Sequence, residues 1–137
     1  MVFGELFLNR IISFGSDFAY FDNKIFSYTH VLAAFWNSNP ILLAAPNKTT
    51  KDIVNDILTF DFANNDLVLV QWHTDELSKD IVHCMDYIKN HHHTKKRNFH
   101  INTGRCKEFD LHLDLPNNQN NQLLVADKIR CLTTEPS

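Results

Sequence analysis

Two short apolar runs separated by a helical pattern constrain the fold more than any other feature of the chain. The runs cover residues 41–45 and 67–70. Apolar runs of this length without alternation are typical of strands that are buried on both faces of a sheet. Between them, Thr49 and Asp52 have capping-box spacing, and apolar residues at helical spacing follow. This strand–helix–strand order favours a parallel sheet with right-handed crossovers.

The remaining pattern predicts one more helix, two further strands and a last helix. Thr74 is expected to cap the longest helix, because Asp75 and Glu76 follow it and suit a helix N-terminus. Residues 98–102 and 109–115 alternate like strands around Gly104, which predicts an antiparallel hairpin. The spacing of apolar residues over 123–132 predicts the final helix.

The first forty residues are expected to be mainly helical. Apolar residues at helical spacing predict helices over residues 2–13 and 27–36, with a strand as the alternative for residues 2–13. The predicted fold class is therefore α/β, bordering on α+β. It comprises a mixed sheet with strand–helix–strand–helix–strand–strand–helix order from residue 41, preceded by two N-terminal helices. At 137 residues, the chain is expected to form a single compact domain, in which residues 1–40 pack on an α/β layer of residues 41–132.

The composition excludes several classes of protein. Three glycines are too few for a phosphate-binding glycine loop or a dinucleotide turn, so no cofactor is expected. Three cysteines without a Cys-x-x-Cys pair argue against a disulfide framework or a thiolate zinc site. No apolar run approaches the roughly 20 residues that span a bilayer, and the start lacks the pattern of a signal peptide. The expected location is the cytoplasm.

Charge is distributed unevenly along the chain. Residues 52–88 contain eight acids and one lysine, whereas residues 89–107 contain six basic residues and no acid. Either these two stretches pair across the fold as solvated faces, or the acidic stretch is a docking surface that steers a basic partner. Because no catalytic motif is recognisable, a binding protein fits better than an enzyme.

The docking interpretation predicts a small inhibitor or immunity-type protein that binds a basic protein such as a toxin nuclease. Neither a nucleic acid nor a membrane is the expected partner, and the oligomeric state is left open. The predicted binding residues are the acids Asp52, Asp56, Asp61, Asp66, Asp75, Glu76 and Asp80.

An alternative function follows from the Asp-x-His-x-Asp pattern near the C-terminus. Asp110, His112 and Asp114 alternate with apolar residues, so they should project from one face of a strand, with His100 beside them. Such a group could bind a divalent metal or form a carboxylate-oriented histidine base, as in a metal-dependent hydrolase or nuclease. The competing interpretation is an edge strand with a solvated charged face.

Two short segments allow further hypotheses. Residues 73–75, His-Thr-Asp, lie where a buried strand should meet a helix, which is a common place for ligands in α/β sheets, although a simple helix cap explains them equally well. Lys95, Lys96 and Arg97 have the charge of an RNA contact, but they form only one short patch in an acidic chain.

Overall fold

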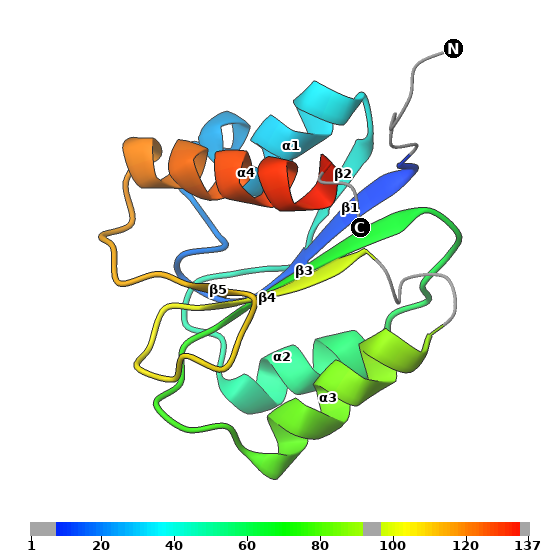
Figure 1. The fold of residues 1–137 in the computed structure, drawn as a ribbon, viewed down its shortest axis with the longest axis vertical. Coiled ribbons are helices and arrows are strands. Elements are labelled where there is room, and N and C mark those ends of the chain that lie inside the picture. The colour runs from blue at the N-terminus through cyan, green and yellow to red at the C-terminus, as the bar shows by residue number, and fades with distance from the viewer. Residues whose placement is uncertain (1–7, 92–96, 135–137) are drawn as a thin grey trace.

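The computed structural model describes residues 8–91 and 97–134, which form a five-stranded sheet with helices on both faces (Figure 1). All strand pairs are parallel, and the order across the sheet is β2-β1-β3-β4-β5. The strands are β1 (Arg10–Phe14), β2 (Asn39–Leu42), β3 (Asp66–Trp72), β4 (Asn98–Asn102) and β5 (Leu111–His112). The α/β class is thus confirmed, whereas the mixed sheet is not.

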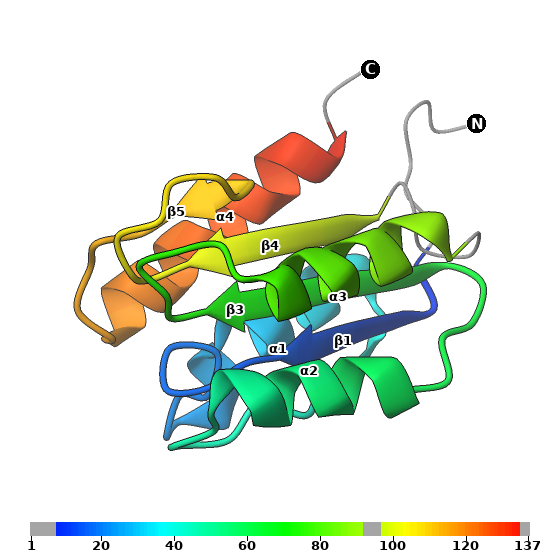
Figure 2. The same cartoon turned by 90° about the horizontal axis from the view of Figure 1, so that it is seen from below.

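Four α-helices form two layers. They are α1 (Tyr28–Trp36), α2 (Thr50–Thr59), α3 (Lys79–Asn90) and α4 (Gln119–Thr134), and a 3-10 turn, η1 (Lys24–Phe26), precedes α1. Helices α1 and α4 cover one face of the sheet, and α2 and α3 cover the other (Figures 1 and 2). Each face has its own apolar core, so the protein is a three-layer α/β structure.

Strand β3 lies at the centre of the sheet and is buried along its whole length. Leu67 and Leu69 belong to the core under α1 and α4, whereas Val68, Val70 and Trp72 belong to the core under α2 and α3. A strand that packs against both layers needs apolar side chains on both sides, which explains the uninterrupted run. The prediction for residues 67–72 is confirmed.

The prediction of two N-terminal helices is wrong. Residues 10–14 form β1, which pairs with both β2 and β3, and only the second predicted helix is present as α1. Ile11, Ile12 and Phe14 are fully buried, and they alternate between the two cores. The helical spacing of apolar residues was misleading, because a strand buried on both faces also places apolar residues at those positions. Half of the predicted helix, residues 2–7, lies outside the described residues.

The edges of the sheet also differ from the prediction. From β2 onward the sequence of strands and helices agrees with it, but β2 is an edge strand and is only half-buried. At the other edge, β5 runs parallel to β4, with Ile101 opposite Leu111. Residues 103–110 form a loop that brings the chain back beside the last two residues of β4 in the same direction, with Phe109 packed on the core under α2 and α3. The predicted antiparallel hairpin is therefore wrong.

The two predicted helix starts have different outcomes. Thr49 caps α2 through a capping box with Asp52, as predicted. Helix α3, however, begins at Lys79 and is capped by Ser78, whose hydroxyl accepts from Ile81 N–H. Thr74 instead forms a local turn with Glu76. The segment between β3 and Ser78 is thus a loop that bends at residues 75 and 76.

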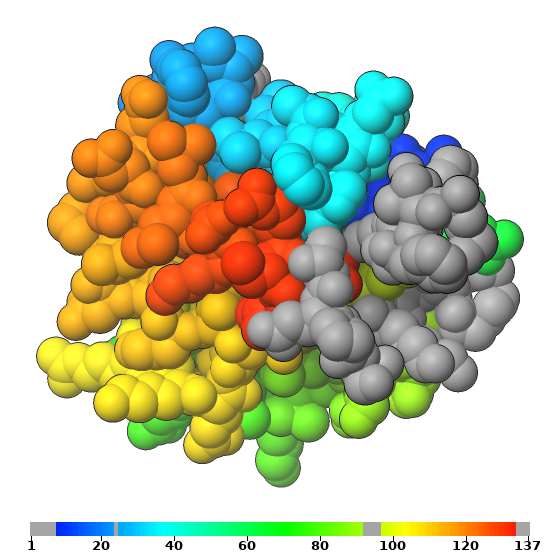
Figure 3. Space-filling model, turned by 45° about the horizontal axis from the view of Figure 1, so that its top comes forward, coloured from blue at the N-terminus to red at the C-terminus, as the bar shows by residue number. Residues whose placement is uncertain are grey.

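Helices α1 and α4 lie side by side and form the outer surface of their layer (Figure 3). Among the described residues, no helix is both long and apolar enough to cross a membrane.

Candidate functional site

A cleft lies at the carboxyl edge of the sheet, where the strand order reverses. The chain leaves β1 toward α1 on one face and leaves β3 toward α3 on the other, although the two strands are neighbours. Loops that diverge in this way leave a crevice, and open α/β sheets commonly bind ligands there. A cavity of about 620 Å³ occupies this position.

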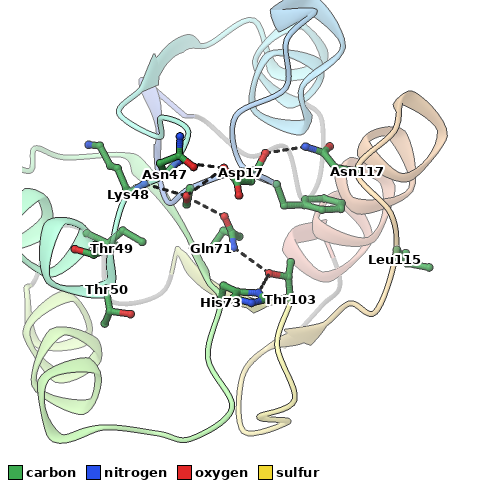
Figure 4. Close-up of a pocket in the computed structure, with 13 residues that line it drawn as sticks. Asp17, Asn47, Lys48, Thr49, Thr50, Gln71, His73, Thr103, Leu115 and Asn117 are labelled. Atoms are coloured by element: carbon green, nitrogen blue, oxygen red, sulfur yellow. Dashed lines mark hydrogen bonds between the residues drawn. The ribbon is translucent and has the colours of Figure 1, made fainter.

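Residues from all five strand ends or the loops after them line the cleft (Figure 4). Most of them are polar but uncharged. The lining residues are Ser16, Asp17, Phe18, Asn47, Lys48, Thr49, Thr50, Ile53, Gln71, His73, Thr103, Leu115 and Asn117.

Gly15 brings the loop after β1 close to β3. Its φ of +145° lies in a region that side chains disfavour, and a Cβ there would be 2.9 Å from the Cβ atoms of Ala19 and Gln71. Only glycine combines this turn with so close an approach. The loop therefore lies directly against the end of β3 and forms one wall of the cleft.

Gln71 joins the ends of three elements at the floor of the cleft. Its side chain is buried, and its Oε1 accepts from Ser16 N–H at 2.9 Å and from Ala19 N–H at 3.4 Å. Its Nε2 donates to the Thr103 hydroxyl at 3.1 Å, and that hydroxyl lies 3.3 Å from His73 Nδ1 (Figure 4). This network fixes the β1 loop and the His73 ring relative to each other.

The N-terminus of α2 forms a second wall. Thr49 Oγ1 accepts from Asp52 N–H, and Asp52 accepts in return from Thr49 N–H, which holds the pKa of the Asp52 carboxyl below its usual value. The N–H groups of Thr50 and Lys51 stand at the first two helical positions, where no intrahelical acceptor exists. The Lys48 ammonium bonds Leu43 O and the Asp56 carboxylate instead of turning into the cleft.

The third wall contains an exposed carboxylate and an amide. Asp17 Oδ1 accepts from Asn47 N–H at 3.2 Å, which leaves Oδ2 as an acceptor. Asn117 Nδ2 donates to the Asp17 carbonyl at 2.7 Å, and its Oδ1 accepts from Gln122 of α4 at 2.8 Å. Gln122 is fully buried and also bonds Phe18 O and Tyr28 N–H. The C-terminal helix is thus connected to the β1 loop.

Of the predicted His73-Thr74-Asp75 segment, only His73 lines the cleft. Thr74 makes its local turn, and Asp75 Oδ1 accepts from Arg105 N–H at 3.1 Å. Only one of the three residues could therefore contact a ligand in the cleft. The prediction that Thr74 caps α3 is wrong, because Ser78 is the cap.

The predicted Asp-His-Asp group does not converge on one point. Asp110 accepts from the backbone N–H of His100, His112 Nδ1 lies 3.2 Å from Cys106 O, and Asp114 is exposed. The His100 ring is buried and accepts from Trp72 Nε1–H at 3.0 Å, and burial lowers its pKa to about 4. Within residues 8–91 and 97–134, no three His, Cys, Asp or Glu side chains are placed to hold a metal ion.

The predicted acidic surface is largely used within the fold. Asp66 is fully buried and makes a bidentate pair with Arg10, at 2.9 Å to Nε and 2.6 Å to Nη2, and this hydrogen bonding raises the pKa of Arg10. Asp56 pairs with Lys48, and Asp52 and Asp75 accept backbone N–H groups. The members that remain as exposed carboxylates without such a contact in the described chain are Asp61, Glu76 and Asp80.

The basic segment is described only in part. Lys95 and Lys96 lie outside the described residues, and Arg97 donates to Asn65 Oδ1 at 2.6 Å. The RNA-contact hypothesis thus stays a prediction.

The sheet order places the protein in the class of doubly wound α/β structures, with a cleft at the switch point. No family model matches the chain, and no curated protein does. Among solved structures, the chain is similar to the hypothetical protein MJ1247 from Methanococcus jannaschii, described with an inferred function of 3-hexulose-6-phosphate isomerase. The identity is 14%, the TM-score is 0.46, and the match covers 95% of this chain and 71% of the other. A similarity at this level assigns no function.

The prediction of an inhibitor or immunity-type protein is corrected here. The physical reason is that the acids on which the prediction depended do not form one open surface, since Asp66 is buried and Asp56 is paired. The alternative of a metal-dependent hydrolase or nuclease depended on Asp110, His112 and Asp114 meeting at one point. It is not supported, because these side chains do not converge in the described residues.

Sequence reasoning missed most of the cleft. Its polar residues come directly after buried strands: Ser16 and Asp17 follow β1, and Thr103 follows β4. The helix predicted over residues 2–13 hides this signal for Ser16 and Asp17, whereas Thr103 follows a correctly predicted strand and carries no motif that marks it.

Replacing Gly15 with alanine tests the shape of the cleft. The new Cβ would meet Ala19 and Gln71 at 2.9 Å in a disfavoured backbone conformation, so we expect the free energy of unfolding to fall by about 1–3 kcal/mol. Chemical denaturation measures this loss. Unchanged stability would show that the loop after β1 does not need the close approach to β3.

Proposed function

We propose that the protein binds a small hydroxylated ligand carrying an anionic group, of the sugar-phosphate class, in the switch-point cleft. The observation that carries this proposal is the set of hydrogen-bonding groups in the cleft that the fold itself does not use. On the α2 side these are the two donors of Thr50, its backbone N–H group and its hydroxyl. On the β1 side, Asp17 Oδ2 is an acceptor.

This arrangement suits a ligand with two chemically different ends. Free N–H groups at a helix N-terminus favour an anionic oxygen, because the partial positive charge of the helix adds to the hydrogen bonds. A carboxylate oxygen accepts hydrogen bonds from hydroxyl groups but repels an anion. The anionic end would therefore lie against α2, and the hydroxyl groups would face Asp17. The volume of about 620 Å³ is within the range of small-molecule sites.

Calorimetric titration with glucose 6-phosphate, glucose and inorganic phosphate tests the proposal. We expect the phosphorylated sugar to bind more tightly than either fragment, because only it reaches both walls. Absence of binding by all three compounds would contradict the proposal.

A pair of threonine variants on α2 tests the location. Thr50→Val removes a hydroxyl at the cleft, whereas Thr59→Val removes one at the opposite end of the same helix, where Thr59 bonds Asn55 O. We expect Thr50→Val to weaken binding of glucose 6-phosphate about 3- to 10-fold, the value of one hydrogen bond, and Thr59→Val to leave it unchanged. Equal effects of the two variants would place the site elsewhere.

A further inference from the structure

A second, smaller cavity adjoins the switch-point cleft on the side of the β1 loop. Its volume is about 220 Å³. Asp17 and Asn117 line both cavities, so the two are neighbours that meet at these residues. The residues that line the second cavity are Asp17, Tyr20, Phe21, Asp22, Pro46 and Asn117. Two aromatic rings and a proline thus stand beside a cleft whose own lining is mainly polar.

Phe21 is the aromatic residue of the second cavity that the fold itself uses less. Tyr20 packs against the core under α1 and α4, whereas Phe21 is half-buried and belongs to neither core. Within the described residues, the Phe21 ring contacts no other aromatic ring, although nearby Phe18 stacks on Tyr28. An apolar ring that lines a cavity and is not packed in a core leaves surface for a flat ligand group to cover.

The charges around the second cavity disfavour a second anionic group. Asp17 and Asp22 line it, and among the described residues no lysine or arginine does. Neither carboxylate forms a salt bridge with a residue that the structure describes. The Lys48 ammonium at the neighbouring cleft is bound to Asp56. The second cavity therefore favours a flat group that is uncharged or positively charged.

The segment before α2 sets the order in which a ligand meets these groups. Pro46 lines the second cavity, Asn47 N–H bonds Asp17 Oδ1, and Thr50 begins α2. Pro46 and Thr50 are four residues apart, which is at most about 14 Å of chain. Along this segment lie an aromatic cavity, then a carboxylate acceptor, then the donors that suit an anion. A hexose phosphate supplies partners only for the last two.

From this order we infer that the ligand is a nucleoside monophosphate whose base enters the second cavity and stacks on Phe21. The phosphate lies against the start of α2, and the ribose hydroxyl groups donate to Asp17 Oδ2. The base is flat and uncharged at neutral pH, as the second cavity requires. The inference rests on the proposed function for the phosphate and the sugar, and it adds the base.

Calorimetric titration with adenosine 5′-monophosphate and ribose 5-phosphate tests the inference, because the two compounds differ in the base. We expect the nucleotide to bind the wild-type protein about tenfold more tightly, a typical value for stacking of one base on an aromatic side chain. Phe21→Ala should remove most of this advantage and leave the binding of ribose 5-phosphate unchanged. Unchanged binding of ribose 5-phosphate also shows that the variant is folded. If the alanine variant does not fold, Phe21→Leu, which keeps an apolar side chain without an aromatic ring, should show the same loss.

Phe35→Ala is the matched control. Phe35 is an exposed phenylalanine that lines a different cavity, between α1 and α4, so we expect its replacement to leave the binding of both compounds unchanged. If ribose 5-phosphate binds but the nucleotide binds no more tightly, the inference is wrong and the proposed function stands. If the nucleotide keeps its advantage in the folded Phe21 variant, the base does not stack on Phe21, and the inference is also wrong. If neither these two compounds nor glucose 6-phosphate binds the wild-type protein, the proposed function fails, and the inference fails with it.

Discussion

Replacing Asp66 with asparagine is expected to lower the free energy of unfolding by about 3 kcal/mol. The Asp66 carboxylate is fully buried, and it accepts two hydrogen bonds from Arg10 and one from Ala63 N–H. Removal of one member of a buried ion pair leaves the other charge without compensation, which typically costs about 3–5 kcal/mol. We expect a loss at the lower end of this range, because the Arg10 side chain is 25% exposed and retains contact with water. Denaturation by urea measures the change.

Asp127→Asn is the matched control for this prediction. Asp127 pairs with Arg130 one helical turn away, and both side chains are exposed. A pair of this kind contributes less than about 1 kcal/mol. If the two substitutions had equal effects, Asp66 would behave as a surface residue, as the docking-surface interpretation assumed.

Acidification is expected to destabilise the wild-type protein through His100. Burial lowers the pKa of its imidazole from 6.5 to about 4 in the folded state. Above pH 6.5 neither the folded nor the unfolded protein binds a proton at this group, and its contribution to stability is complete. As the pH falls from 6.5 to 4, the unfolded chain takes up the proton first. The free energy of unfolding therefore decreases by about 1.4 kcal/mol per pH unit, or about 3 kcal/mol in total.

Comparison with His100→Gln isolates this contribution from those of the carboxyl groups. Glutamine offers an oxygen to the Trp72 indole N–H group, which His100 Nδ1 accepts at 3.0 Å, but it does not titrate. Urea denaturation at several pH values between 7 and 4.5 should show a steeper loss of stability for the wild-type protein than for the variant. Equal pH dependence of the wild-type protein and the variant would mean that folding does not lower the pKa of His100.

Local patterns were predictable where one interaction determines the structure. The capping box of Thr49 and Asp52 depends on residues three positions apart, and the fully apolar run of β3 reflects burial from both sides. The direction of a strand is harder to predict from local sequence, because it depends on the side from which the chain re-enters the sheet. The alternation around Leu111 is the same in a parallel and an antiparallel pair, and only the path of the loop before it distinguishes the two.

The candidate site could be predicted only as far as the strands before it were recognised. His73 was singled out because β3 was predicted, whereas Asp17 was not, because β1 was interpreted as a helix. The sequence gives the formal charge of each acid, but it does not show which of the acids is buried in the fold. Asp66 and Asp80 look alike in the sequence, yet Asp66 is fully buried and Asp80 is exposed.

The contacts of Gln122 attach the last helix to the rim of the cleft, although the two are about a hundred residues apart along the chain. One side chain of α4 holds the Phe18 carbonyl, the start of α1 and Asn117, so it connects the rim of the cleft to the opposite end of the polypeptide. A shortened protein that lacks α4 would lose the anchor of that rim even though all five strands were retained. Tags and truncations at α4 are thus expected to alter the rim of the cleft.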